Sequence, residues 1–273
     1  MIQVEERYIS LLTDFGFKRI FGTAMNKDLL ICFLNSLFDG KQVVKDVSYL
    51  NPEHVGDVYT DRKAIFDVYC EGENGEKFIV EMQNAYQTYF KDRSLFYSTF
   101  PIREQAALLN FDMNEEAFEK EKIRHSVQLC DTATHKVFYD KLELIYVEIA
   151  KFNKSLEELE TLYDKWLYAL KNLYKLTQRP KELCDKVFDR LFEEAEIAKF
   201  TPQELREYEA SKIAYRDIKN SVDTAKREGI AEGMEKKSHE IAKKMLTKGM
   251  DEATVMEITG LSAELIQQLK AEM

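Results

Sequence analysis

The stretch Ala64-Ile65-Phe66-Asp67-Val68-Tyr69-Cys70 leads through a polar turn into Phe78-Ile79-Val80-Glu81-Met82-Gln83. Both runs are rich in β-branched and aromatic residues, and Asn74-Gly75 lies between them, a pattern typical of an antiparallel hairpin. A turn centred on Asn74 would place Asp67 opposite Glu81, at about 5 Å. A two-residue turn at Asn74-Gly75 would instead point the two carboxylates to opposite faces of the hairpin.

The first of these registers has a chemical consequence. Opposed carboxylates repel each other, so this arrangement is stable mainly with a cation between them. Carboxylate oxygens are hard ligands and favour Mg²⁺ or Mn²⁺. Strand alternation places Gln83 on the same face as Glu81, and Phe78, Val80 and Met82 on the other. The sequence therefore predicts a metal site held by Asp67 and Glu81, provided that the turn is odd or bulged.

Length and composition limit the class of protein. The chain has 273 residues, of which 45% are hydrophobic and 12% aromatic, enough for a globular core. Its four cysteines are widely spaced, which argues against a zinc site or a disulfide framework and favours the reducing cytoplasm. No apolar run reaches the roughly 18 residues of a membrane span. With a formal net charge of −10, the composition does not predict a broad electrostatic attraction to nucleic acid, so any such binding must be local.

Hydrophobic periodicity divides the first half of the chain into helices and strands. We expect helices over residues 8–21 and 27–38, the second capped by Asn26. Strands are expected over residues 43–50, 64–70 and 78–83, and a helix over 92–109 that Pro101 kinks or breaks. Residues 126–130 and 137–149 read as two more strands, which extend the sheet or form a hairpin beside it.

The second half is predicted to be helical. Apolar residues recur at helical spacing from 156 to 174 and again from 183 to 191. A third helix begins at the capping box Thr201-Pro202-Gln203-Glu204. Residues 226–240 read as a charged helical linker. The last short helices are compatible with a helix-turn-helix, although a packing or dimerising tail is the preferred interpretation, because the final helix contains no arginine.

Several motifs in this order resemble the recombination-promoting nuclease and transposase family of the PD-(D/E)XK nuclease superfamily. These are Thr13 to Gly22, Asn26 to Asn35, Phe66-Asp67-Val68, Val80-Glu81-Met82-Gln83, Arg93 to Ser98, Val147 to Phe152 and Asp164 to Leu167. The resemblance implies an α/β (α+β) fold, a restriction-endonuclease-like mixed sheet core flanked by helices and followed by a helical C-terminal region. We place the nuclease-like core at residues 1–152, a helical extension at 153–225, the linker at 226–240 and a small helical tail at 241–273.

The resemblance also implies a function: a Mg²⁺-dependent DNA endonuclease, with Mn²⁺ as an alternative ion, that serves recombination or a transposase-like mobile element. Asp67 and Glu81 would bind the metal, Gln83 would stand where related nucleases carry lysine and orient a water, and Asp14 would complete the acidic set. From composition alone, a helix cap is the favoured role of Asp14. Candidates for contacts to the DNA backbone are Lys18, Arg19, Lys91, Arg93 and Arg103.

One departure from the family pattern supports an alternative function. After Gln105, a further core strand is expected to be shortened or absent, with residues 108–113 as a truncated substitute. A missing core strand would expose an apolar edge and remove support behind the site. The alternative is therefore a catalytically inactive relative that binds DNA or self-associates. In either case we expect DNA as the partner and no membrane, and we leave a homo-oligomer open.

Overall fold

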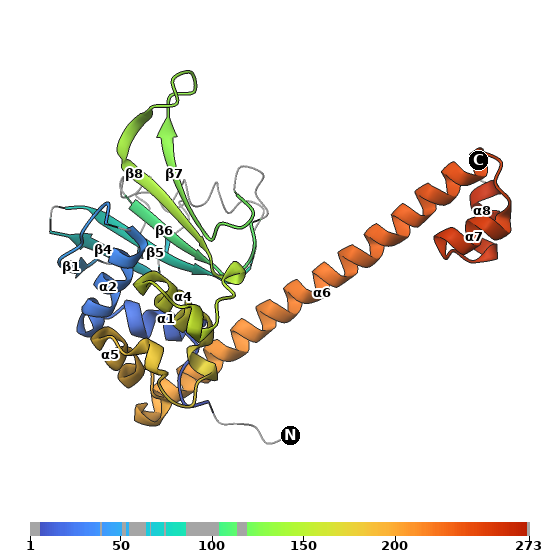
Figure 1. The fold of residues 1–273 in the computed structure, drawn as a ribbon. Coiled ribbons are helices and arrows are strands. Elements are labelled where there is room, and N and C mark those ends of the chain that lie inside the picture. Colours follow the sequence, from blue (N-terminus) through green and yellow to red (C-terminus); the bar gives the residue numbers. More distant parts are fainter. Residues whose placement is uncertain are drawn as a thin grey trace. The chain divides into compact units, whose positions relative to one another are not determined.

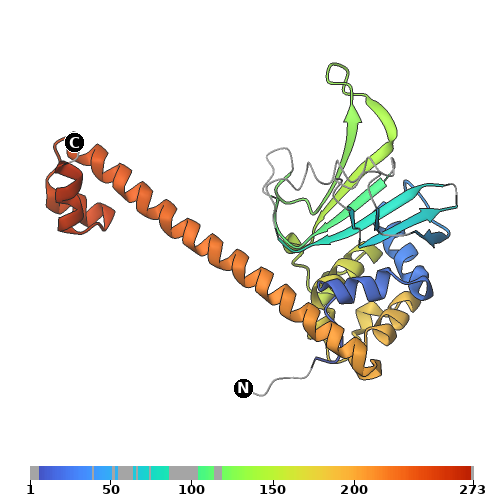
Figure 2. The same cartoon turned by 180° about the vertical axis from the view of Figure 1, so that it is seen from behind.

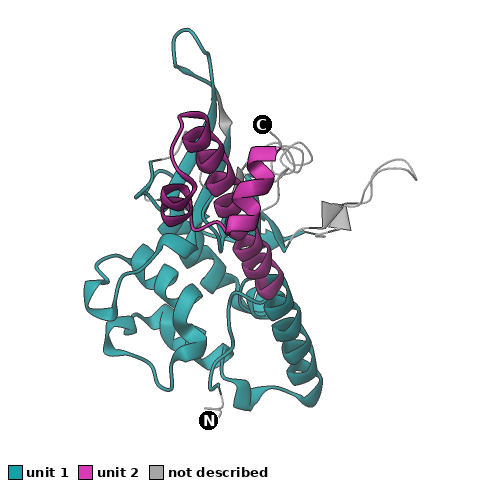
Figure 3. Ribbon diagram, turned by 90° about the vertical axis from the view of Figure 1, so that its right-hand side faces the viewer, with its two compact units in different colours: residues 1–218 teal, residues 219–273 magenta. Residues whose placement is uncertain are grey.

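The structure, a computed structural model, describes residues 6–38, 40–50, 53–54, 64–65, 67–73, 75–85, 104–113 and 119–271. The chain forms two compact units, residues 1–218 and 219–273, coloured separately in Figure 3. Each unit has a hydrophobic core of its own.

The first unit is built around a mixed six-stranded sheet with the strand order β1-β4-β5-β6-β8-β7 (Figure 1). Its strands are β1 Val47–Tyr49, β4 Val68–Gly72, β5 Lys77–Gln83, β6 Glu104–Leu109, β7 Arg124–Cys130 and β8 Val137–Glu148, and a separate pair consists of β2 Glu53–His54 and β3 Ala64–Ile65. Strands β5, β6 and β8 run parallel, whereas β1, β4 and β5 pair antiparallel, as do β7 and β8. The carboxyl ends of β5, β6 and β8 therefore lie along one edge of the sheet.

Helices cover one face of this sheet (Figures 1 and 2). They are α1 Asp14–Phe21, α2 Lys27–Phe38, α4 Leu162–Asn172, α5 Lys186–Glu194 and the start of α6 Pro202–Thr247, with short 3₁₀ turns at Ala24–Asn26, Ile149–Lys151, Leu156–Glu158, Leu173–Lys175, Lys181–Leu183 and Ile197–Lys199. Trp166 lies at the centre of their core, with its ring 5.7 Å from that of Phe21, 5.6 Å from Phe33 and 5.0 Å from Phe188. This layered α+β architecture is the predicted fold class.

The first helix is shorter than predicted. It begins at Asp14, because the Thr13 side chain caps it by accepting the N–H of Gly16 at 3.1 Å. The apolar residues before Thr13 are buried, and their spacing resembles that of a helix. They do not form one, since Tyr8 makes an isolated β-bridge with Glu196. Contrary to the sequence prediction, Asn26 is not the N-cap of the second helix. It ends a 3₁₀ turn that continues directly into α2, and its side-chain amide donates to the carbonyl of Arg19.

Two of the predicted strands are also reduced in the structure. The strand expected over residues 43–50 is only β1, because Asn35 holds both the N–H and the C=O of Val44 through its side chain. The strand expected over residues 64–70 is divided: β3 pairs with β2, a bend lies at Asp67, and β4 begins at the next residue.

The most consequential correction concerns the helix predicted over residues 92–109. Its last six residues, Glu104–Leu109, form strand β6, which pairs in parallel with β5 on one side and β8 on the other. Residues 92–103 lie outside the described residues. The core strand expected to be shortened or absent is therefore present at the centre of the sheet, and the reason for expecting an inactive protein no longer applies.

The helical second half follows the prediction more closely. The capping box is formed, since the Glu204 carboxylate accepts the N–H of Thr201 at 2.8 Å and the Thr201 hydroxyl accepts the N–H of Glu204 at 3.2 Å. The predicted third helix, the linker at 226–240 and the helix expected after residue 241 are one continuous helix, α6. Two short helices follow, α7 Glu252–Thr259 and α8 Ala263–Ala271. They close the second unit around Ala242, Met245, Val255, Ile266 and Leu269.

Candidate active site

The register of the β4–β5 hairpin decides where the two predicted metal ligands lie. Val68 pairs with Val80, so one step further along the same register Asp67 lies opposite Glu81. Of the two registers compatible with the sequence, the odd one is therefore present. Gly75 allows this turn, because its φ of 79° is a left-handed conformation that glycine adopts easily. Asp67 and Glu81 thus start from facing positions on neighbouring segments.

The carboxylate of Asp67 is held between a backbone amide and an ammonium group. Its Oδ2 accepts the N–H of Met82 at 2.8 Å, and its Oδ1 lies 3.7 Å from Nζ of Lys18. The side chain is only 23% exposed. Burial raises the pKa of Asp67, and the Met82 hydrogen bond and the Lys18 charge lower it by less. The site therefore favours the entry of a further positive charge near Asp67 when this group is ionised.

Glu81 is a buried carboxylate, with 6% of the residue exposed, on the face of β5 opposite the helices. Its neighbours Val80 and Met82 face the other way and pack in the main core, as the alternation predicted. Two carboxylates on adjacent segments, with water and phosphate oxygens in the remaining positions, form the kind of site that Mg²⁺ uses. The part of the chain that the structure describes contains no cluster of three or more metal-binding His, Cys, Asp or Glu residues. The carboxylates of Asp67 and Glu81 supply the oxygen donors that such an ion would require.

Helix α1 brings a third carboxylate to this end of the hairpin. Asp14 Oδ1 lies 2.7 Å from Nζ of Lys18, one helical turn away, and the same ammonium group is the one near Asp67. Asp14 is the first helical residue and Thr13 is the cap, so the capping role expected for Asp14 is wrong. Gly16 is needed in this turn, because a Cβ there would lie 2.1 Å from the carbonyl oxygen of Ser10. The helix thereby places Asp14 and Lys18 beside the hairpin.

Gln83 is the last residue of β5 and shares the face of Glu81 by strand alternation. Its Nε2 donates to the carbonyl of Ala85 at 3.1 Å. An amide carries no charge and cannot accept a proton as a base. Gln83 can therefore orient a neighbouring molecule by hydrogen bonding, but it cannot supply the positive charge of a lysine.

The predicted DNA contacts divide into three cases. Arg19 is engaged within the protein: its guanidinium donates to the Glu194 carbonyl, pairs with the Glu204 carboxylate and lies 4.3 Å from the centre of the Phe200 ring. Lys18 faces the carboxylates instead. The remaining candidates, Lys91, Arg93 and Arg103, lie outside the described residues.

A second charged cluster lies on the same edge of the sheet, around Glu148, a charged residue within an otherwise apolar strand. The register aligns Gln83 of β5 with Leu109 of β6 and Glu148 of β8. Glu148 is fully buried, and its Oε2 lies 2.8 Å from Nζ of Lys151 and 3.0 Å from Nε2 of His125. Glu148 and its partners Lys151 and His125 are far from Gln83 in the sequence. Only the parallel pairing of β5, β6 and β8 brings them to the same edge of the sheet.

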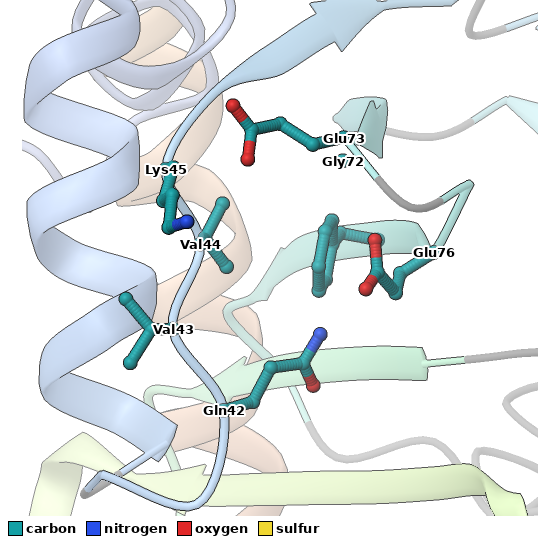
Figure 4. A pocket seen from close by; sticks show the side chains of 8 residues that line it. Gln42, Val43, Val44, Lys45, Gly72, Glu73 and Glu76 are labelled. Carbon is teal, nitrogen blue, oxygen red and sulfur yellow. The ribbon is translucent and has the colours of Figure 1, made fainter.

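A small pocket lies at the other end of the hairpin (Figure 4). It is lined by Gln42, Val43, Val44, Lys45, Gly72, Glu73, Glu76 and Phe78. Gly72 is five residues from Asp67 along an extended chain, about 17 Å at 3.3 Å per residue. This pocket is therefore separate from the acidic site.

Comparison with known proteins supplies the family. A family model described as PD-(D/E)XK nuclease family transposase matches residues 11–225, most of the chain. The chain belongs to this family. Membership confirms the resemblance drawn from the motifs and makes the protein a relative of nucleases linked to mobile elements. PD-(D/E)XK nucleases generally use divalent metal ions, which agrees with the donor set of Asp67 and Glu81. No curated protein and no solved structure matches the chain.

A second family model concerns the C-terminal unit. It is described as the C-terminal HTH domain of the Rpn/YhgA-like nuclease family and matches residues 235–271. In this range α7 ends at Gly260, whose φ is 70°, and α8 follows after a short turn. The match supports the helix-turn-helix interpretation over the packing tail that the sequence favoured, and it supports binding to DNA. No helix in the described part of this family member is long and apolar enough to cross a membrane.

Proposed function

We propose that this protein is a metal-dependent DNA endonuclease that hydrolyses phosphodiester bonds in recombination or in the movement of a mobile element. The observation that carries the proposal is the hairpin register, which sets Asp67 opposite Glu81 in a chain of a nuclease family. The four free cysteines, Cys32, Cys70, Cys130 and Cys184, agree with work in the reducing cytoplasm.

In this proposal each residue of the site has a separate task. Asp67 and Glu81 hold the divalent ion, with Mg²⁺ as the first choice and Mn²⁺ as the alternative. Such an ion, when bound, neutralises charge on the phosphate and lowers the pKa of a bound water. Gln83 orients the attacking water by hydrogen bonds and leaves its proton to another acceptor. Asp14 completes the acidic set from the first turn of α1.

The test is cleavage of plasmid DNA by the purified full chain, with and without Mg²⁺. We expect Asp67→Ala and Glu81→Ala to lower the rate by about 100-fold or more, the loss typical of removing one charge-stabilising group from an active site. Glu71→Ala is the matched control, because Glu71 lies on the same hairpin and pairs with Lys77 at 2.5 Å, away from the site. Equal rates in the Asp67, Glu81 and Glu71 variants would eliminate the proposed site.

A catalytically silent DNA-binding protein is the second candidate, since the helix-turn-helix match supports DNA binding and does not bear on cleavage. The two functions differ in one measurement, because both predict DNA binding and only the nuclease predicts Mg²⁺-dependent product. Binding without cleavage over a range of Mg²⁺ and Mn²⁺ concentrations would select the silent protein.

A further inference from the structure

Helix α1 and the hairpin bring Asp14, Lys18 and Asp67 together, and Lys18 supplies the positive charge in this group. Its Nζ lies 2.7 Å from Asp14 Oδ1 and 3.7 Å from Asp67 Oδ1. The ammonium group thus joins a carboxylate of helix α1 to the carboxylate that the proposed function assigns to the metal. With 42% of its side chain exposed, Lys18 also remains accessible to a phosphate that enters the site.

The motif position that follows Glu81 provides no such charge. The family is named for a (D/E)XK motif, in which a lysine follows the acidic residue after one intervening position. Here the corresponding residues are Glu81, Met82 and Gln83. Gln83 is neutral and its amide donates to the Ala85 carbonyl, so β5 lacks the cation that the motif name specifies. Phosphodiester hydrolysis accumulates negative charge on the phosphate, and a cation placed beside it stabilises that charge.

We propose that Lys18 is the catalytic cation of this site and takes the place, from helix α1, of the lysine that position 83 lacks. This inference rests on the proposed nuclease function. In this role Lys18 keeps its proton throughout and donates hydrogen bonds to a non-bridging phosphate oxygen. A water oxygen forms the new P–O bond and loses its proton to solvent, and the old P–O bond breaks as the leaving oxygen takes a proton from solvent. Asp14 acts as a positioning residue, because it holds the ammonium group at the end of α1.

The contacts of the adjacent basic residue also support this assignment. Arg19, the adjacent basic residue, is committed to Glu194, Glu204 and Phe200, so it cannot serve in place of Lys18 without breaking these contacts.

The experiment relocates the lysine. We compare Mg²⁺-dependent cleavage by the wild type, Lys18→Gln, Gln83→Lys combined with Lys18→Gln, and the matched control Lys27→Gln. Lys27 is a half-exposed lysine that pairs with Asp46 at 2.7 Å, outside the site. We expect Lys18→Gln to lower kcat by about 100-fold with KM changed by less than about threefold, as for an interaction made in the transition state. The double variant should recover at least about tenfold of this loss, because it restores a lysine at the motif position.

Each outcome separates the two proposals. If Lys18→Gln is as active as Lys27→Gln, or if its reduced activity arises entirely from a higher KM, the catalytic role of Lys18 is overturned. The nuclease function remains intact in both cases. If the double variant is no more active than Lys18→Gln, the inference that Lys18 takes the place of a lysine at position 83 is overturned. A wild type that does not cleave DNA overturns the proposed function and this inference together. Thermal unfolding of each variant identifies any loss of activity that arises from unfolding.

Discussion

Replacing Glu148 by glutamine should destabilise the first unit more than any surface change of the same size. The carboxylate is fully buried, and its Oε1 accepts the N–H of Met113 at 2.6 Å. Its Oε2 lies 2.8 Å from Nζ of Lys151 and 3.0 Å from Nε2 of His125. Glutamine has one acceptor oxygen and one NH₂ donor. The variant would therefore lose the charge that faces Lys151 and would bring a donor against a donor on one side.

The magnitude follows from the burial of this cluster. Removing one partner of a buried ion pair costs about 3–5 kcal/mol when the other charge is left without compensation. Asp112, whose Oδ1 lies 3.3 Å from Nζ of Lys151, offsets part of this loss, so the lower end of the range, about 3 kcal/mol, applies here. For a domain of this size, each kcal/mol lowers the midpoint of thermal unfolding by about 2–4 °C. Glu148→Gln should therefore unfold about 6–12 °C below the wild type.

The protein carries its own probe for this measurement. Its single tryptophan, Trp166, is fully buried in the core of the first unit, so its fluorescence follows the unfolding of that unit. Glu143→Gln is the matched control, because Glu143 is on the same strand and contacts the exposed Ser126 hydroxyl. We expect the control to lie within about 0.5 kcal/mol of the wild type. If Glu148→Gln also unfolds within this range, the cluster does not depend on a buried charge and the reasoning is refuted.

Three further predictions concern other parts of the chain. Asp67→Asn should stabilise the metal-free protein at neutral pH, because burial raises the pKa of Asp67 in the folded state and the ionised carboxylate is therefore unfavourable there. This gain in stability should disappear below pH 3.8, the ordinary pKa of the group, where Asp67 is protonated in both states. Urea unfolding over a pH series measures it, and a larger gain in acid would contradict the prediction. Thr201→Ala should cost about 1 kcal/mol by removing the cap of α6, measured as a shift of the urea midpoint, and no shift would show that the capping box with Glu204 carries no stability. Gly260→Ala should lower the stability of the C-terminal unit by about 1–2 kcal/mol, because the φ of 70° is unfavourable for alanine. It should also weaken DNA binding measured by fluorescence anisotropy, and an unchanged affinity would show that this turn is not needed for DNA recognition.

The part of the site that follows from local pattern was accessible from the sequence. Strand alternation placed Glu81 and Gln83 together and Val80 and Met82 on the other face, since side chains alternate at every residue. The same pattern left two registers open, because Asn74-Gly75 is compatible with turns of different length. The pairing observed in the structure decides between them.

The rest depended on contacts between distant segments. A short segment such as residues 104–109, of which the last four are apolar, is compatible with a helix or a strand, and only its parallel partners β5 and β8 determine which forms. The pair Asp14 and Lys18 has the spacing of a helical ion pair and could be predicted locally. Its approach to Asp67, 49 residues beyond Lys18, could not.

The hairpin register has a consequence for how this family tolerates insertions and deletions. Gain or loss of one residue in the turn between Gly72 and Lys77 would shift the pairing by one position and bring Asp67 opposite a residue that points toward the helices. A change of two residues would restore the face. The length of this turn therefore constrains the site together with the identity of the acidic residues, whereas its composition is constrained at Gly75, whose φ is 79°.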